Sequence, residues 1–153
     1  MKRTLAWLLA STLAICVAPA HATFHLFRID QVYSNSDGSV QYVVMRESTG
    51  SNGENLWAGK SLSTTSTSGT KQQFTFPADL PSSATASKSV LIATSGFNAL
   101  VGFAPDYVIP NGFIPLTGGI LSYVNGTDQI TLPVLPTDGA TAIDRNGTHV
   151  SAT

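Results

Sequence analysis

The stretch FHLFRIDQVYSNSDGSVQYVVMRE, residues 24–47, places two runs of β-branched and aromatic residues on either side of a polar turn. Residues 24–33 form the first run and residues 40–47 the second, and both favour β-strands because such side chains pack well on a pleated surface. Between them, Asp37-Gly38 supplies the positive φ that a tight hairpin turn requires. This stretch therefore predicts an antiparallel hairpin and indicates a β-protein.

The rest of the chain continues this pattern of short apolar runs separated by glycine, asparagine and proline, and no long segment carries apolar residues at helical spacing. One short helix is expected at residues 95–102, capped by Ser95 and carrying Phe97, Leu100 and Val101. About eight strands bounded by turn residues predict an all-β sandwich or barrel. The six strands expected after the first hairpin are residues 55–63, 72–76, 89–94, 119–124, 128–132 and 140–145, with Asn125-Gly126 as a second hairpin turn.

Alternation of side chains along these strands predicts which residues fill the core. Residues 61–70 and 82–89 are rich in hydroxyl side chains with little that a core can bury, and we expect them to be solvated loops. The residues expected in the core are Ile29, Val32, Val43, Met45, Leu62, Phe76, Leu91, Ile130 and Ile143.

The N-terminus has the features of an export signal. Basic residues precede an apolar stretch over residues 5–17, and the sequence AHA at residues 20–22 fits a cleavage site for small residues. We therefore expect a signal peptide helix over residues 1–22 and a single domain over residues 23–153, which has an ordinary size for one domain.

Two alternatives to a cleaved signal are disfavoured. As a helix, residues 5–17 would reach only about 20 Å, short of the roughly 30 Å that a transmembrane anchor must cross. A lipoprotein signal ending at Cys16 resembles the leader less well, because Ile15 stands where such signals carry Gly or Ala. We expect an exported protein, periplasmic or extracellular, that does not span the membrane after signal removal.

Cleavage would remove Lys2, Arg3 and the chain's one cysteine, Cys16. Six Lys and Arg would then stand against nine Asp and Glu, a net charge of −3. This balance argues against a basic face for nucleic acids. The loss of the thiol excludes cysteine catalysis, disulfides and thiolate metal sites in the mature protein.

Candidate catalytic residues are few. The mature chain has two histidines, His25 at the start of the first strand and His149 near the C-terminus, and neither has a partner motif for nucleophilic hydrolysis. We expect no catalytic residue, no cofactor and no metal ligand set. The alternative is a small secreted hydrolase or inhibitor, in which Glu47, Glu54 or Asp106 would act beside an aromatic cleft.

Trp57 is the only tryptophan after the signal, flanked by Gly53 and Gly59. Aromatic residues in the middle of the chain are expected to fill the core. Among them, Trp57 is the best candidate for an exposed platform on which a sugar could stack, so we treat it as a possible binding residue.

Several segments, taken in order, resemble lamin-tail-like domains. Residues 29–38, IDQVYSNSDG, and residues 41–47, QYVVMRE, resemble the family's opening strands "I-x-x-V-Y-x-N" and "E-F-I-E-L-x-N", with Val44 in place of an acidic residue. The segment over residues 97–117 is longer than in the family and is similar to that of a group of bacterial exported proteins. Looser matches at residues 57–62, 74–77, 90–93 and 138–147 extend the resemblance to about residues 27–147.

The resemblance implies an immunoglobulin-like sandwich of two sheets that serves as a binding or structural module, and it offers no catalytic residues to carry over. We therefore expect an exported, non-catalytic module of the cell envelope or extracellular space. Its partner would be an unknown protein or envelope polymer, bound through loops or an exposed sheet edge.

Overall fold

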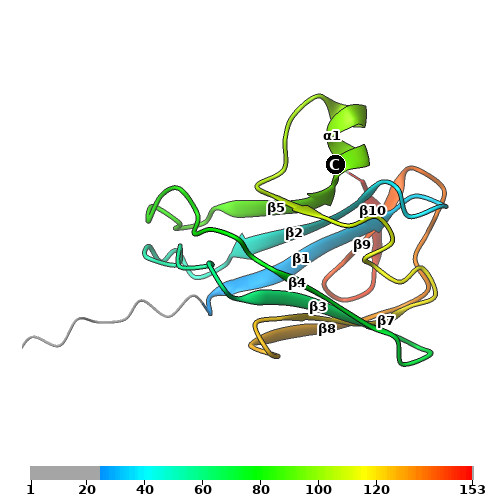
Figure 1. The fold of residues 1–153 in the computed structure, drawn as a ribbon, viewed down its shortest axis with the longest axis horizontal. Coiled ribbons are helices and arrows are strands. Elements are labelled where there is room, and N and C mark those ends of the chain that lie inside the picture. Colours follow the sequence, from blue (N-terminus) through cyan, green and yellow to red (C-terminus); the bar gives the residue numbers. More distant parts are fainter. Residues whose placement is uncertain (1–24, 153) are drawn as a thin grey trace, which may run out of the picture.

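Two β-sheets packed face to face make up the structure, a computed structural model that describes residues 25–152 (Figure 1). The six-stranded sheet has the order β10-β9-β1-β2-β5-β6, and the four-stranded sheet the order β4-β3-β7-β8. The elements are β1 (Phe27–Ser34), β2 (Gln41–Glu47), β3 (Ser61–Ser66), β4 (Lys71–Thr75), β5 (Ser89–Thr94), α1 (Ser95–Val101), β6 (Tyr107–Ile109), β7 (Gly119–Tyr123), β8 (Asp128–Leu132), β9 (Thr141–Asp144) and β10 (His149–Ser151). The predicted all-β, immunoglobulin-like sandwich with one short helix is confirmed in its two-sheet architecture. The signal helix expected over residues 1–22 lies outside the described residues.

The hairpin predicted at the start of the chain is formed by β1 and β2, which pair antiparallel along their length. The backbone N–H of Asn35 donates to the Val40 carbonyl at 2.9 Å and closes the turn. Gly38 lies in this turn with φ 71°, a conformation that is costly for residues with a Cβ. The Asp37-Gly38 signal in the sequence therefore marks the real turn.

A β-bulge in β1 places two predicted core residues on the same face. The register shifts between Ile29 and Gln31, so strict alternation is interrupted at Asp30. Ile29 and Val32 are three residues apart and would otherwise point to opposite faces of the sheet. With the bulge, both are fully buried in the core.

The core between the sheets is centred on Trp57, which is fully buried. Its ring lies 4.8–5.6 Å, centroid to centroid, from the rings of Phe27, Phe76, Tyr107 and Tyr123. Aromatic contacts of this kind contribute about 0.5–1.5 kcal/mol each beyond the area that they bury. The contacts of this aromatic cluster therefore help to hold the two sheets together.

The predicted core is confirmed at every position except Leu91. Leu91 is half-buried and packs against the second apolar cluster, on the outer face of the six-stranded sheet. Its neighbours Val90 and Ile92 take the inner face instead, because successive side chains of a strand point to opposite sides. The confirmed residues are Ile29, Val32, Val43, Met45, Leu62, Phe76, Ile130 and Ile143.

The second sheet corrects two predictions from the sequence. Residues 61–66, expected to belong to a solvated loop, form β3, which lies between β4 and β7. Thr64 is buried there because its hydroxyl donates to the Phe113 carbonyl at 2.9 Å, so the polar group keeps a partner. The strand expected over residues 55–63 begins only at Ser61. In the six-stranded sheet, the sequence pattern also misses the two edge strands, β6 and β10, which have three residues each.

The predicted short helix is present as α1, directly after β5 (Figure 1). Its N-cap is Thr94 rather than the expected Ser95. The Thr94 hydroxyl makes no capping bond, since it donates to the Ser39 carbonyl at 2.7 Å and accepts the Gln41 N–H at 3.0 Å. Gly102 ends the helix in the left-handed conformation, φ 78°. Across residues 25–152, no helix has the length and apolar character needed to cross a membrane.

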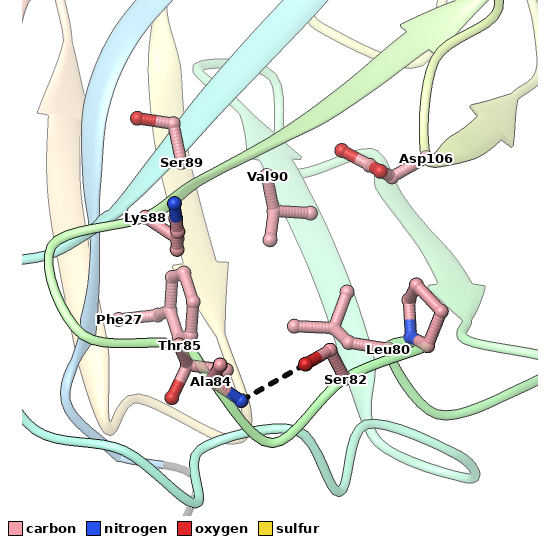
Figure 2. A pocket seen from close by; sticks show the side chains of 10 residues that line it. Phe27, Leu80, Ser82, Ala84, Thr85, Lys88, Ser89, Val90 and Asp106 are labelled. Atoms are coloured by element: carbon pink, nitrogen blue, oxygen red, sulfur yellow. Dashed lines mark hydrogen bonds between the residues drawn. The ribbon is translucent and has the colours of Figure 1, made fainter.

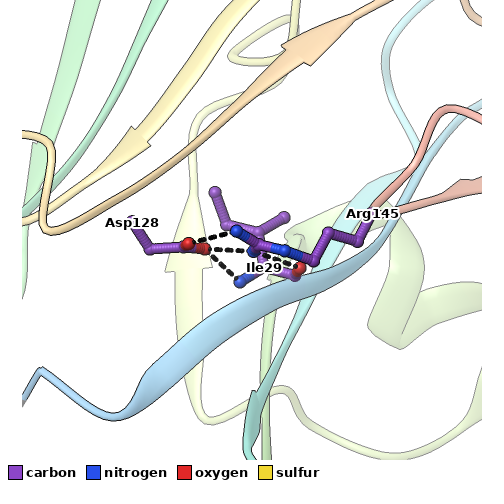
Figure 3. A network of polar contacts seen from close by, with 3 residues as sticks. All are labelled: Ile29, Asp128 and Arg145. Atoms are coloured by element: carbon purple, nitrogen blue, oxygen red, sulfur yellow. Dashed lines mark hydrogen bonds and ion pairs between the residues drawn. The ribbon is translucent and has the colours of Figure 1, made fainter.

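An ion pair between Asp128 and Arg145 joins the two sheets (Figure 3). Asp128 begins β8 and Arg145 follows β9, and two hydrogen bonds of 2.6 and 2.7 Å connect them. Asp128 also accepts the Ile29 N–H at 2.7 Å, and Arg145 donates to the Ile29 carbonyl at 3.1 Å. The pair thus satisfies backbone groups of β1 next to its bulge.

Candidate functional site

Trp57, the possible binding residue, has no surface open to a ligand. Its relative exposure is 0%, and its indole N–H donates to the Glu54 carbonyl at 2.9 Å. The expectation of an exposed stacking platform at Trp57 is therefore wrong. The ring instead stabilises the fold from the centre of the core, because it fills a space between the two sheets that a smaller side chain would leave empty.

Glu47, the first carboxylate of the hydrolase alternative, is buried at the end of β2. Its oxygens accept hydrogen bonds from the backbone N–H groups of Thr49, Gly50 and Ser87, at 2.8, 2.9 and 2.7 Å, and from the Thr49 hydroxyl. Burial alone raises the pKa of this carboxyl, but the hydrogen bonds outweigh it and lower the pKa of Glu47 to about 2. The side chain is thus an ionised anchor for two loops at neutral pH.

Glu47→Gln should lower the free energy of unfolding by about 1–3 kcal/mol at neutral pH, because an amide nitrogen would face backbone N–H donors. The folded-state pKa of about 2 lies below the ordinary value of 4.5. The stabilisation is therefore complete above pH 4.5 and is lost as the pH falls towards 2. Urea unfolding of both proteins over this pH range should show the difference between them shrinking in acid. A difference independent of pH would contradict the anchoring role.

The other two carboxylates lie in different surroundings. Glu54 is buried, and its Oε2 accepts the Leu26 N–H at 3.1 Å. Burial and the nearby charge of Glu54 raise the pKa of Tyr123, so that phenol stays neutral. Asp106 is exposed just before β6. Of the three candidates, Asp106 alone lines either of the two cavities described below, and neither cavity brings Glu47, Glu54 and Asp106 together.

The two histidines also stand apart from the cavities. His25 and His149 are exposed, and His149 is the first residue of β10. Within the part of the chain that the structure describes, no group of three or more His, Cys, Asp or Glu side chains is placed to hold a metal ion.

The larger cavity, which we call the β5 pocket, has a volume of about 320 Å³ and lies beside the start of β5 (Figure 2). Phe27, Leu80 and Val90 form its apolar floor, and Figure 2 shows Lys88 and Asp106 on either side of Val90. The remaining lining residues are small or carry hydroxyl groups: Pro81, Ser82, Ala84, Thr85 and Ser89.

One wall of the β5 pocket, residues 80–88, is irregular but tied to the segment before β3. Ser87 has φ 56°, unusual for a residue with a Cβ, and its N–H donates to the buried Glu47 carboxylate. The Thr85 hydroxyl accepts the Glu54 N–H at 3.1 Å and donates to the Ser51 carbonyl at 3.1 Å. These buried anchors hold the wall in one shape. Two backbone hydrogen bonds add to them, Gly53 N–H to Ser83 at 2.8 Å and Leu80 N–H to Asn55 at 2.9 Å.

The second cavity, the α1 groove, has a volume of about 210 Å³ and lies between α1 and the outer face of the six-stranded sheet. A chain of aromatic contacts runs along it: Tyr33 stacks on Tyr42 at 5.1 Å, Tyr42 meets Phe97 at 5.5 Å, and Phe97 meets Phe103 at 5.6 Å. No charged side chain is among its lining residues, which are Tyr33, Val40, Tyr42, Phe97, Leu100, Val101, Phe103, Gly139 and Ala152.

The mouth of the α1 groove is an exposed apolar surface. Leu100 is 71% exposed, Phe103 56% and Val101 41%. The sequence predicts Leu100 and Val101 on a short helix beside Phe97, but only Phe97 of the three is buried. A helix of seven residues can press one narrow face against the sheet, so its other apolar side chains stay in solvent.

Comparison with known proteins finds no matching family model, no matching curated protein and no matching solved structure.

Proposed function

We propose that this protein is an exported, non-catalytic binding module of the cell envelope or extracellular space, and that it engages its partner through the α1 groove. The two-sheet sandwich agrees with the architecture that the resemblance to lamin-tail-like domains implies, and we propose that kinship over about residues 27–147. Export, to the periplasm or the extracellular space, is the part of the proposal that rests on residues 1–22.

The observation that carries the proposal is the group of exposed apolar side chains at α1. Leu100, Val101 and Phe103 lie together at one cavity, whereas the other exposed apolar residues are distributed over β6, β7 and loops. Single apolar residues are common on protein surfaces, but a contiguous patch beside a cavity marks an interaction site. The proposal that the module is non-catalytic is supported by Glu47 and Glu54, which are buried and accept hydrogen bonds from the backbone.

The chemistry of the groove selects the kind of partner. Because no lining residue is charged, a charged group would lose its hydration there without gaining a partner. The exposed patch offers on the order of 300 Å² of apolar surface, well below the roughly 800 Å² per subunit of a stable dimer. A segment of another protein that inserts a bulky apolar side chain fits these features better than a second copy of the chain.

Selection of peptides from a displayed random library against the purified domain tests this proposal. Selected peptides should carry an aliphatic or aromatic anchor, and Phe103→Ser should weaken their binding by about tenfold or more. Val134→Ser is the matched control, because Val134 is also 71% exposed but lies outside the groove. Isothermal titration of the same peptides measures both effects.

Two results would overturn this assignment. One is equal weakening of peptide binding by Phe103→Ser and Val134→Ser, which would show that the groove is not the site. The other is binding of the domain to neutral phosphatidylcholine vesicles, abolished by Phe103→Ser, with no peptide selected. That outcome would assign the apolar surface to a lipid bilayer instead.

A further inference from the structure

The β5 pocket is separate from the α1 groove and shares no residue with it. Its volume of about 320 Å³ lies at the small end of the range of ligand pockets, roughly 300–1,000 Å³. An apolar floor with a few polar groups around it is the usual arrangement in such sites. The polar groups therefore decide which ligand would fit.

Lys88 contributes a free positive charge. Its side chain is exposed and has no ion-pair partner among the described residues. An ammonium without a protein partner at the edge of an apolar pocket can pair with the anionic group of a ligand.

Asp106 contributes a negative charge with a defined orientation. Its Oδ2 accepts the Leu91 N–H at 2.8 Å, and its own N–H donates to the Leu91 carbonyl at 2.9 Å. The second carboxylate oxygen accepts no hydrogen bond from the described residues, so it is available to a donor on a ligand. Lys88 and Asp106 stand at the two ends of Ser89–Val90, with the apolar floor between them (Figure 2).

We propose that the β5 pocket binds a small zwitterion of amino-acid type with an apolar side chain. The ligand carboxylate pairs with Lys88, its ammonium with Asp106, and its side chain packs on Leu80 and Val90. A ligand with only one charge forms one of the two ion pairs and not the other, so the site favours the zwitterion over it. The wall anchored by Glu47 and Thr85 is formed before the ligand arrives, which lowers the conformational cost of binding.

Isothermal titration of the purified mature protein with leucine, isocaproate, isoamylamine and glycine tests the ligand class. Isocaproate lacks the ammonium of leucine, isoamylamine lacks the carboxylate, and glycine lacks the apolar side chain. Leucine should bind about tenfold more tightly than each of the other three. Absence of leucine binding at millimolar concentration, or equal binding of isocaproate or isoamylamine, would overturn the proposal.

Variants assign the two charges. Lys88→Met should weaken the binding of both leucine and isocaproate. Asp106→Asn should weaken the binding of leucine and leave that of isocaproate unchanged or tighter. Lys71→Met, on exposed β4 outside the pocket, is the matched control and should change neither. Leucine binding that survives Lys88→Met would overturn the site. Phe103→Ser should leave the affinity for leucine unchanged, so the two proposals can fail independently of each other. Loss of leucine binding in that variant would instead place the ligand in the α1 groove.

Discussion

Asp128→Ala is expected to lower the free energy of unfolding by about 3 kcal/mol, near the lower end of the cost of breaking a buried ion pair. Asp128 is 7% exposed, and its removal leaves the Ile29 N–H without an acceptor and the Arg145 guanidinium with only the Ile29 carbonyl. The guanidinium side chain is 33% exposed, so water can replace part of what it loses. The backbone N–H of Ile29 lies inside the sandwich and has no such replacement.

Chemical unfolding of the purified protein measures this effect, and a second ion pair provides the control. Arg46 and Asp30 are 3.4 Å apart with side chains 54% and 47% exposed, so Asp30→Ala should cost less than about 1 kcal/mol. Equal costs for the two variants would show that Asp128 does not act as a clamp between the sheets. The double variant Asp128→Leu, Arg145→Met should recover only part of the loss, because it removes both charges together but still leaves the buried Ile29 N–H without an acceptor.

Trp57→Ala should have the largest effect on stability of any single substitution in the core, about 3–5 kcal/mol. The ring contacts four aromatic side chains from both halves of the sandwich, and the closely packed neighbours can fill the space it leaves only in part. A domain of this size has a total stability of only about 5–15 kcal/mol, so this variant is close to the limit of folding.

Trp57→Phe keeps the prediction measurable. It retains an aromatic ring but loses the indole N–H bond to Glu54 and part of the packing, and should cost about 1–3 kcal/mol. Leu56→Ala is the matched control, since the adjacent Leu56 is 42% exposed and should change stability by less than about 0.5 kcal/mol. If Trp57→Phe unfolded like the wild type but lost binding to a ligand, Trp57 would be a surface residue and its burial would be wrong.

The unit β5-α1-β6 positions both candidate sites. Ser89 and Val90 at the start of β5 line the β5 pocket, and Asp106 reaches the same pocket from the segment leading into β6. At the other end of β5 the chain enters α1, which covers the outer face of the sheet and forms the α1 groove. β6 pairs parallel to β5, so the intervening segment must cross from one end of the strand to the other. This crossover therefore explains why the β5 pocket lies at one end of β5 and the α1 groove at the other.

The sequence by itself determined the elements whose signals are local. β5 and β8 begin and end at the residues that the pattern predicts, and the Asp37-Gly38 and Asn125-Gly126 turns join the strands expected on either side of them. Alternation within a strand needs only neighbouring residues, so it placed most of the core correctly, but Ile29 and Val32 share the core face only because of the bulge between them. Weak local signals failed: β6 and β10 have three residues each and exist because longer strands offer them a partner.

The tertiary structure alone decided what the side chains do. From its sequence context, Trp57 could stack on a ligand or fill the core. In the structure, four rings from distant segments surround it and bury it in the core. Glu47 could serve as an acid, but donors up to 40 residues away make it an ionised anchor. Asp128 begins a strand that the sequence predicts, but only the structure shows that its carboxylate accepts the N–H of Ile29, 99 residues away in the chain. In each case the chemistry follows from burial and from contacts between segments far apart in sequence. A linear pattern cannot contain that information, because the same residue has a different pKa, exposure and set of partners in each packing arrangement.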